Sequence, residues 1–365
     1  MKLIYKYIFQ ELLTPFIFGV AAFVGIFIGT DLLFELTQYY TDYGVKILTL
    51  AQLFFLKLPS IIVLSFPMAT LLATIVGYSR LSGDSEITAL RAGGISIYKL
   101  VLPALIIGLI MSFVTIGINE FIVPGANYLS NKIVWEFRHN RDFPRTQTNL
   151  FLRPMDSKSN RPDYILFSHK YDGESGELSE VVIQDFEEGR TSAVIEAERG
   201  RWTQDNWFLY DGIIYNIKQG ERIPVLRFEE YRAEQISYTP TQISKMDKDI
   251  DDMSMRELRE HIRILSEQGE NPQEEWVEWH QRLSIPFASF IFVLLAAPLG
   301  IKPRRSSGSA VGMGLSILVI FIYYIILIIG SALGGSGTIP PWLGAWLQNI
   351  IFLILGTILL FRVAR

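Results

Sequence analysis

The sequence predicts an α-helical membrane protein with six transmembrane helices and an all-β, jellyroll-like sandwich domain, inserted on the extracytoplasmic side between helices 3 and 4. Two observations carry this prediction. Of the 70 Asp, Glu, Lys and Arg residues, 13 precede residue 120, 5 follow residue 282 and 52 lie between them. The two ends of the chain also contain uncharged apolar runs long enough to cross a bilayer, whereas the middle contains short stretches typical of strands.

The uncharged runs 12–30, 58–79, 100–119 and 283–301 each approach the roughly 20 residues that a membrane-spanning helix needs. A final run, 306–361, is too long for one span, and GGSGTIPP at 334–341 divides it into two. The first run is longer than the ~7–15 apolar residues of a signal peptide, so we expect it to be retained. The sequence therefore predicts six spans.

Lys and Arg residues in the short loops predict the orientation of these spans, because cytoplasmic loops are enriched in them. One side has only Lys46 and Lys57. The other side has ten: Lys2, Lys6, Arg80, Arg91, Lys99, Lys302, Arg304, Arg305, Arg362 and Arg365. We therefore expect both termini in the cytoplasm and the middle domain outside it.

Charges are nearly absent from the spans themselves. Only Asp31, Glu35 and Lys57 come near, at the outer ends of spans 1 and 2, which disfavours a proton- or sodium-driven transporter. Gly25-x-x-x-Gly29 in span 1 and Gly308-x-x-x-Gly312 at the start of span 5 permit close helix contact. Either pattern fits a specific interface or ordinary membrane-helix packing.

Composition excludes several kinds of site. The chain has no cysteine, so disulfides, thiolate metal sites and cysteine nucleophiles are excluded. Its four histidines show no metal-ligand spacing, and we expect no bound metal. The net charge of −4 and the lack of a long basic run indicate no nucleic-acid partner. The phosphate-binding pattern GxxxxGK[ST] is also missing from the sequence.

The predicted domains are residues 1–120 (spans 1–3), 121–250 (β domain), 251–282 (helical connector) and 283–365 (spans 4–6). Within the β domain, four strand-like segments between residues 163 and 221 are separated by turn signals such as Asp205-Asn206. The domain has no recognisable catalytic motif, which favours a binding or structural role over an enzyme. In the connector, Ser254 and Glu257 form a capping-box pattern, and Gly269 is a helix stop.

The polar run RLSGDSEITALRAGG at 80–94 predicts a short cytoplasmic helix over about 82–93, with Asp84 as N-cap and a double-glycine stop. A helix this short is marginal in water, so its spans or a partner must fix it. Ile87 and Leu90 share a face. This apolar face, flanked by Glu86 and Arg91, favours a groove in a protein partner over a bilayer surface, where Asp84 and Glu86 would meet anionic headgroups.

Three stretches of the chain resemble one family of proteins. They are SRLSGDSEITALRAGGISIYKL (79–100), WHQRLSIPFASFIFVLLAAPLGIKPRRSSGSAVGMGLSI (279–317) and PPWLGAWLQNIIFLILG (340–356). In this order they resemble the LptF/LptG permeases, the membrane subunits of the ABC transporter that extracts lipopolysaccharide from the inner membrane. The resemblance covers nearly the whole chain, including six spans with a soluble domain between the third and the fourth.

The resemblance implies a set of partners. The chain would lie in the inner membrane and pair with a second LptF/LptG-type permease, a paralogue or a copy of itself, enclosing a cavity for lipopolysaccharide that spans 1 and 5 gate. Its β domain would be a periplasmic jellyroll that passes the lipid to a bridge protein of similar fold. A cytoplasmic ABC ATPase dimer would bind ATP and Mg²⁺, so this chain would bind no cofactor and catalyse no reaction.

The resemblance also implies roles for residues. Glu86 falls on the family's acidic coupling-helix position, which engages a groove of the ATPase. The residues expected to couple to the ATPase are Asp84, Glu86, Ile87, Leu90 and Arg91. Those expected along the lipid path or its lateral gate are Gly25, Phe27, Asp31, Glu35, Lys46, Lys57, Gly308 and Gly312.

One feature departs from the family. Family members often have basic residues at the outer end of span 1, which meet the lipid phosphates, whereas this chain has Asp31 and Glu35. The partner subunit, Lys46 and Lys57, or bridging divalent cations would then contact the phosphates.

Two other functions stay open at this point. One is an envelope scaffold or receptor with a β binding domain, which would leave the cytoplasmic helix without a purpose. The other is an integral membrane enzyme that modifies lipids or glycans. Such an enzyme would need carboxylates or histidines in or beside the membrane, and these are nearly absent.

Overall fold

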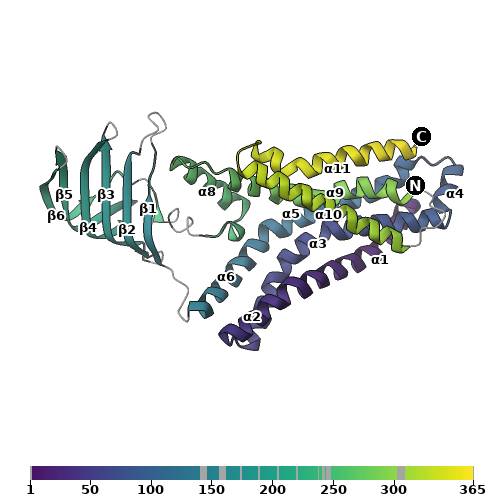
Figure 1. Ribbon diagram of the computed structural model, residues 1–365, viewed down its shortest axis with the longest axis horizontal. Helices are drawn as coiled ribbons and strands as arrows, with labels where there is room; N and C mark the ends of the chain where they lie inside the picture. The colour runs from purple at the N-terminus through teal and green to yellow at the C-terminus, as the bar shows by residue number, and fades with distance from the viewer. Residues whose placement is uncertain are drawn as a thin grey trace. The chain divides into compact units, whose positions relative to one another are not determined.

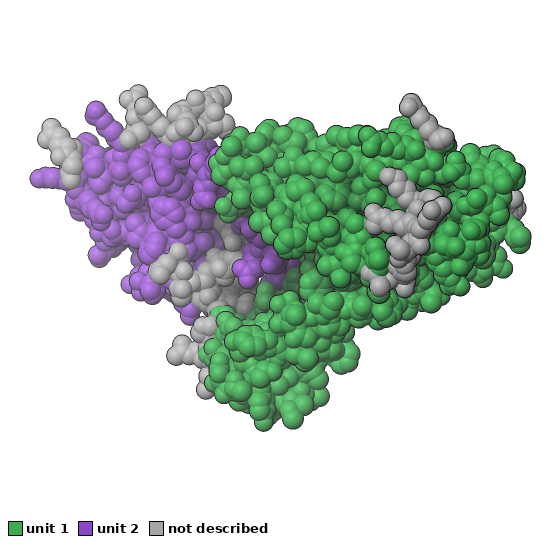
Figure 2. Space-filling model, turned by 45° about the vertical axis from the view of Figure 1, so that its right-hand side comes forward, with its two compact units in different colours: residues 1–140, 273–365 green, residues 141–272 purple. Residues whose placement is uncertain are grey.

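The computed structural model describes residues 2–139, 146–155, 162–172, 175–187, 190–203, 205–218, 221–236, 238–240, 243, 248–301 and 309–364. The chain divides into two compact units, which Figure 2 colours separately. The first comprises residues 1–140 and 273–365 and is helical. The second comprises residues 141–272 and contains a β-sheet.

The helical unit confirms the six predicted spans. In the described part of the chain, six helices are long and apolar enough to cross a membrane. Span 1 combines α1 (Lys2–Phe27), a π-helical turn η1 (Ile28–Leu32) and α2 (Leu33–Tyr43). The others are α3 (Ile47–Gly83), α5 (Ile97–Phe121), α9 (Gln273–Ile301), α10 (Ser309–Gly335) and α11 (Pro341–Ala364).

Spans 1 and 2 are much longer than their uncharged runs. The first has 41 residues, counted from Leu3 to Tyr43, and the second has 37. At 1.5 Å per residue these are about 60 Å and 55 Å long, roughly twice the thickness of the hydrocarbon core. Helical hydrogen bonding continues past the point at which charged residues begin. The ends of both spans therefore extend beyond the apolar layer, where their charged side chains contact one another.

Helix α9 is the central helix of this unit and packs against α3, α5 and α11 (Figure 1). Small residues permit these close approaches. A Cβ atom added at Gly108 of α5 would lie 2.9 Å from Val293, and one at Gly300 would lie 2.7 Å from the Cβ of Tyr78 on α3. On α11, Gly356 packs against the backbone of Leu294 in the same way. The core of the helical unit is therefore built around α9.

Both ends of the chain lie at one end of the helical unit, beside the short helix α4 (Glu86–Ala92) (Figure 1). Ile8 of α1, Ile87 of α4 and Ile301 of α9 belong to one buried cluster, against which Val363 of α11 packs. This arrangement agrees with the charge pattern, which predicts that the termini and the 80–94 segment share one side.

The second unit contains one antiparallel sheet whose six strands follow their order in the sequence. The strands are β1 (Thr146–Leu152), β2 (Tyr164–Asp172), β3 (Glu177–Glu187), β4 (Arg190–Thr203), β5 (Asn206–Lys218) and β6 (Glu221–Arg232). The predicted all-β domain is confirmed, and β2–β5 coincide with the four predicted segments. The described strands form a single meander instead of two stacked sheets, because each strand pairs with the one that follows it.

The other layer of this domain's core comes from the chain after β6. Ala233, Ile236 and Tyr238 are buried against the sheet, as is Ile264 of α8 (Met255–Glu267). The indole N–H of Trp207, which is fully buried, donates a hydrogen bond to the carbonyl of Tyr238 at 2.7 Å. Among the described residues, a chain segment and one helix therefore cover the sheet.

The domain borders differ from the expected residue numbers. Residues 123–139 form α6 (Val123–His139) in the helical unit, whereas α8 belongs to the sheet-containing unit. Helix α6 packs Ile133, Val134 and Phe137 against spans 1 and 2, and its amphipathic pattern is easily taken for the start of a soluble domain.

The capping box of α8 is confirmed, because the Ser254 hydroxyl accepts from the Glu257 N–H at 3.3 Å and the reciprocal bond is 2.8 Å long.

Candidate functional site

The short helix α4 connects spans 2 and 3. Asp84 was predicted as its N-cap, and this prediction is wrong because α3 continues to Gly83 and Asp84 forms the C-cap of α3. The N-cap position of α4 is Ser85, which has a left-handed backbone with a φ of +63° and makes no capping hydrogen bond. The predicted glycine stop is confirmed, since α4 ends at Ala92 and Gly94 has a φ of +81°.

The apolar side of α4 faces the protein's own core. Ile87 is only 4 % exposed and lies in the cluster with Ile8 and Ile301, and Leu90 packs partly against it. The prediction that Ile87 docks into a partner is therefore corrected: its burial anchors a seven-residue helix that is too short to be stable alone. Just before α4, the hydroxyl of Ser82 at the end of α3 donates to the carbonyl of Ile301 on α9 at 2.9 Å and joins these two spans.

A polar face of α4 is left for contact with other molecules. Thr88 and Arg91 of α4 are exposed, and Glu86 is partly exposed. The neighbouring Asp84, at the end of α3, is exposed as well. Asp84 lies 3.9 Å from Arg80, which is a long and exposed ion pair and contributes little. Any partner of this surface therefore meets charged and hydrogen-bonding groups more than apolar ones.

Glu86 contacts the first span, which the sequence did not predict. The hydroxyl of Tyr7 on α1 donates a hydrogen bond to Oε2 of Glu86, at 2.6 Å. One helical turn further along α1, Oε1 of Glu11 lies 3.0 Å from the guanidinium of Arg80. Tyr7 and Glu11 share a helix face because they are four residues apart, and that spacing was the one available signal.

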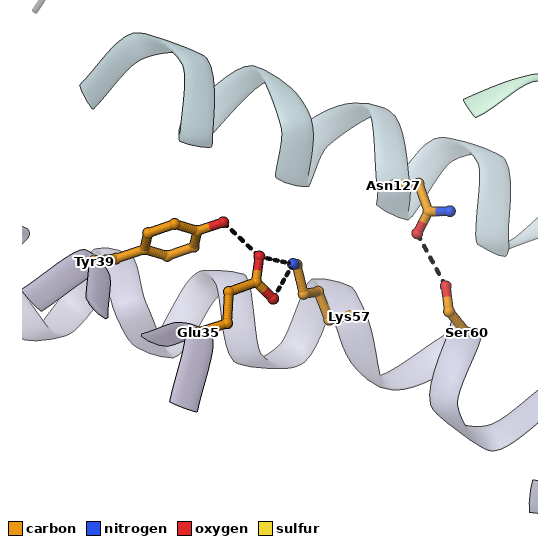
Figure 3. Close-up of polar contacts among 5 residues, drawn as sticks. All are labelled: Glu35, Tyr39, Lys57, Ser60 and Asn127. Carbon is orange, nitrogen blue, oxygen red and sulfur yellow. Dashed lines mark hydrogen bonds and ion pairs between the residues drawn. The ribbon is translucent and has the colours of Figure 1, made fainter. Parts of the chain in front are cut away.

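A second polar cluster lies at the opposite ends of spans 1 and 2 (Figure 3). Glu35 on α2 forms an ion pair with Lys57 on α3, and it also accepts a hydrogen bond from the Tyr39 hydroxyl. The guanidinium of Arg138 on α6 lies 5.5 Å from the centre of the Tyr39 ring. Two predicted residues, Glu35 and Lys57, are thus brought together, while Tyr39 and Arg138 were missed.

Apolar packing fixes the geometry of this cluster. Leu32, Leu36 and Tyr39 form one face of span 1 and pack against Leu53 of α3. The ring of Phe137 meets Tyr39 edge-on, with 5.0 Å between centroids. Ser60 donates to Asn127 at 2.9 Å and so joins α3 to α6 (Figure 3). Tyr39 lies four residues after Glu35, a spacing from which the sequence could have indicated it.

The other predicted gate residues that the structure describes do not join either cluster. Asp31 is exposed and accepts a hydrogen bond from Thr30 at 3.2 Å, and Lys46 is exposed before α3. In the described part of the chain, a Cβ atom at Gly25 or Gly29 would meet no atom within 4 Å. Phe27 is half-buried. A Cβ atom added at Gly312 would lie 3.2 Å from Ile75. Gly308 lies outside the described residues.

These features define a multi-pass membrane protein with six spans, a β domain between spans 3 and 4, and a bundle-anchored helix between spans 2 and 3. A family model described as "Lipopolysaccharide export system permease LptF/LptG" matches residues 6–362. The chain therefore belongs to the LptF/LptG family, whose members are transporter permeases and not enzymes.

Individual relatives support this assignment. The chain is similar to the lipopolysaccharide export system permease protein LptF of Escherichia coli K12, with 23 % identity over 322 residues. This match covers 83 % of the chain and 80 % of the relative, and LptF of Shigella flexneri gives the same values. An uncharacterised protein of Rickettsia prowazekii is 24 % identical over 158 residues, which is 41 % of this chain and 43 % of that protein.

Proposed function

We propose that this chain is a permease subunit of an ABC transporter that extracts lipopolysaccharide, or a related glycolipid, from the inner membrane. A separate cytoplasmic ATPase dimer, which binds ATP and Mg²⁺, drives the extraction. The periplasmic β domain passes the lipid to a bridge protein of similar fold. Membership of the LptF/LptG family and the presence of a β domain between spans 3 and 4 support this proposal.

The position of α4 is the observation that carries the proposal. Its buried Ile87 packs with residues of spans 1, 2 and 4, and the Ser82–Ile301 hydrogen bond joins the adjoining end of span 2 to span 4, so a force on α4 reaches the helical core. Asp84, Thr88 and Arg91 remain exposed for a partner. A rigidly attached, polar-faced helix between two spans suits the transfer of movement from a cytoplasmic ATPase, with Glu86 as its central contact.

A second LptF/LptG-type permease, a paralogue or a copy of this chain, completes the lipid cavity in this proposal. Spans 1 and 5 both carry large apolar side chains on an exposed face, including Phe18 and Ile26 of α1 and Ile317 and Phe321 of α10. Such faces suit lipid or another membrane helix. The open side of Gly25 and Gly29 also leaves room for a helix of the second subunit.

The lipid phosphates need cations that are not already paired. Lys57 is bound to Glu35, which removes it from the group of free cations at the outer end of span 1. We therefore expect the phosphates to be met by the partner subunit, by Lys46, or by divalent cations that bridge them to Asp31. These alternatives are distinguished by measuring lipid crosslinking with and without a chelator.

Co-purification tests the proposal. The wild-type chain is expected to co-purify with an ABC ATPase, and Glu86→Lys is expected to lose that ATPase because it reverses the charge on the exposed polar face. Asp42→Lys is the matched control, since Asp42 is an exposed acid at the other end of span 1. Retention of the ATPase by Glu86→Lys would contradict the assignment. A wild-type chain that captures no ATPase would favour the scaffold or receptor function.

A further inference from the structure

Two polar contacts lie side by side between the first turns of span 1 and the region of α4. Tyr7 donates to Glu86 at 2.6 Å, and Glu11 forms an ion pair with Arg80 at 3.0 Å. Arg80 is the last basic residue of α3 before α4 begins. The sequence separates Tyr7 from Glu86 by 79 residues, so tertiary packing alone brings them together.

Apolar packing beneath these contacts holds span 1 in place. Ile8 and Leu12, which follow Tyr7 and Glu11 along α1, are 2 % and 3 % exposed. Both belong to the cluster that also buries Ile87 of α4. A Cβ atom at Gly77 of α3 would lie 2.6 Å from a terminal methyl of Leu12, so the glycine lets this side chain pack closely against α3.

The Tyr7 hydrogen bond also determines how Glu86 is presented. A carboxylate accepts hydrogen bonds on two oxygens. Tyr7 binds Oε2, which restricts the rotamer of the Glu86 side chain and leaves Oε1 for a cationic or hydrogen-bonding group of a partner. An exposed glutamate without such a contact would lose more side-chain entropy when a partner bound it.

We propose that Tyr7 is a positioning residue for coupling to the ATPase: it orients the Glu86 carboxylate and joins span 1 to α4. This inference rests on the proposed function. Spans 2 and 3 move with α4 because they are covalently continuous with it. Span 1 has no such covalent connection. A displacement of α4 therefore reaches span 1 through the Tyr7–Glu86 hydrogen bond and the apolar cluster of Ile8, Leu12 and Ile87. The Glu11–Arg80 ion pair adds a link from the end of span 2.

A double-mutant cycle on the reconstituted transporter tests this role. The readouts are the affinity for the ATPase and the lipid released per ATP hydrolysed. Tyr7→Phe removes only the hydroxyl and is expected to lower both about threefold to tenfold, which corresponds to the modest net energy of one exposed, charge-assisted hydrogen bond. Tyr5→Phe is the matched control, because it removes a hydroxyl from the same helix without touching Glu86.

The decisive comparison uses the Glu86→Gln background. If Tyr7 acts by orienting Glu86, Tyr7→Phe will have little further effect there. An equal loss in both backgrounds would show a merely structural role and overturn the proposal. An unchanged Tyr7→Phe transporter would overturn it as well. A wild-type complex that releases no lipid would instead contradict the proposed function itself.

A charge exchange at the neighbouring contact provides a second test. Glu11→Arg and Arg80→Glu each place like charges opposite each other, and each is expected to reduce lipid release per ATP. The doubly exchanged variant recreates an ion pair and is expected to restore the release. Failure of the double exchange to restore it, in a protein of unchanged thermal stability, would show that this contact does not transmit movement between span 1 and the end of span 2 that precedes α4.

Discussion

Glu35 and Lys57 form an ion pair that joins α2 to α3, at the end of the helical unit opposite α4. In the sequence alone, Glu35 counts as one of two acids at this end of span 1, with Asp31, and Lys57 counts as one of two lysines that could meet a phosphate, with Lys46. The structure makes them partners, so each removes the other from that count. Glu35 and Lys57 therefore neutralise each other, and Asp31 remains as an exposed acid at this end of span 1.

Glu35→Gln is expected to release Lys57. The side chains are 34 % and 26 % exposed, so loss of the pair is expected to cost about 1 kcal/mol of stability. The freed ammonium should raise the affinity for a phosphorylated glycolipid several-fold, measured by titration in detergent. Asp31→Asn is the control, and it should leave stability within about 0.5 kcal/mol because Asp31 is exposed. Equal lipid affinities for wild type and Glu35→Gln would contradict the prediction.

Ile87→Ala is expected to detach α4 from the helical core. Ile87 is 4 % exposed, and truncation of a buried isoleucine typically costs about 2–5 kcal/mol. Thermal unfolding of the purified chain should show a clear loss of stability, and hydrogen exchange in residues 86–92 should become faster. Thr88→Ala, on the exposed face of the same helix, should change neither measurement. Equal stabilities for the two variants would mean that α4 is not anchored by its apolar side.

Glycines in the membrane unit should divide into two groups according to how much their replacement by alanine destabilises the chain. A Cβ atom at Gly344 of α11 would lie 2.6 Å from the carbonyl oxygen of Gly330 on α10, so Gly344→Ala should destabilise the chain by about 1–3 kcal/mol. Gly25→Ala and Gly29→Ala meet open space and should leave the isolated chain unchanged. If both open-side variants also assemble normally with a second permease subunit, the Gly25-x-x-x-Gly29 pattern is not an interface.

The capping box of α8 predicts a pH dependence. Burial raises the pKa of Glu257, but the backbone N–H of Ser254 and the ammonium of Lys248 outweigh it, so the folded pKa lies below the usual value of 4.5. A depressed folded pKa stabilises the fold above the unfolded pKa, and this contribution is lost as pH falls through the folded pKa. Glu257→Ala should therefore cost about 1 kcal/mol at pH 7.

The stability difference between wild type and Glu257→Ala should shrink as the pH falls below about 4. The Glu257 carboxylate of wild type is then protonated and no longer stabilises the helix, and the variant lacks that carboxylate at every pH. Hydrogen exchange of residues 255–267 measures the local stability of α8 without unfolding the membrane unit. A difference between wild type and Glu257→Ala that stays constant from pH 7 to pH 3 would show that the carboxylate charge does not contribute.

Much of the architecture could be predicted because it depends on local composition. The six spans follow from apolar run lengths, and the glycine stop of α4 and the Ser254–Glu257 capping box follow from residues within one or two turns. Errors arose where a local signal was shared by two structures. Asp84 is an equally good residue for the end of α3 and the start of α4, and the unbroken hydrogen bonding of α3 decided between them.

By itself the sequence determined which segments cross a membrane, which form strands, and where a short helix lies between spans 2 and 3. Only the tertiary structure decided that Ile87 faces the core, that Lys57 is neutralised by Glu35, and that Glu86 is held by Tyr7. Apolar run length and capping are properties of neighbouring residues, so they can be recognised in the chain alone. Contacts across 22 or 79 residues arise from the packing of whole helices, which no local pattern specifies.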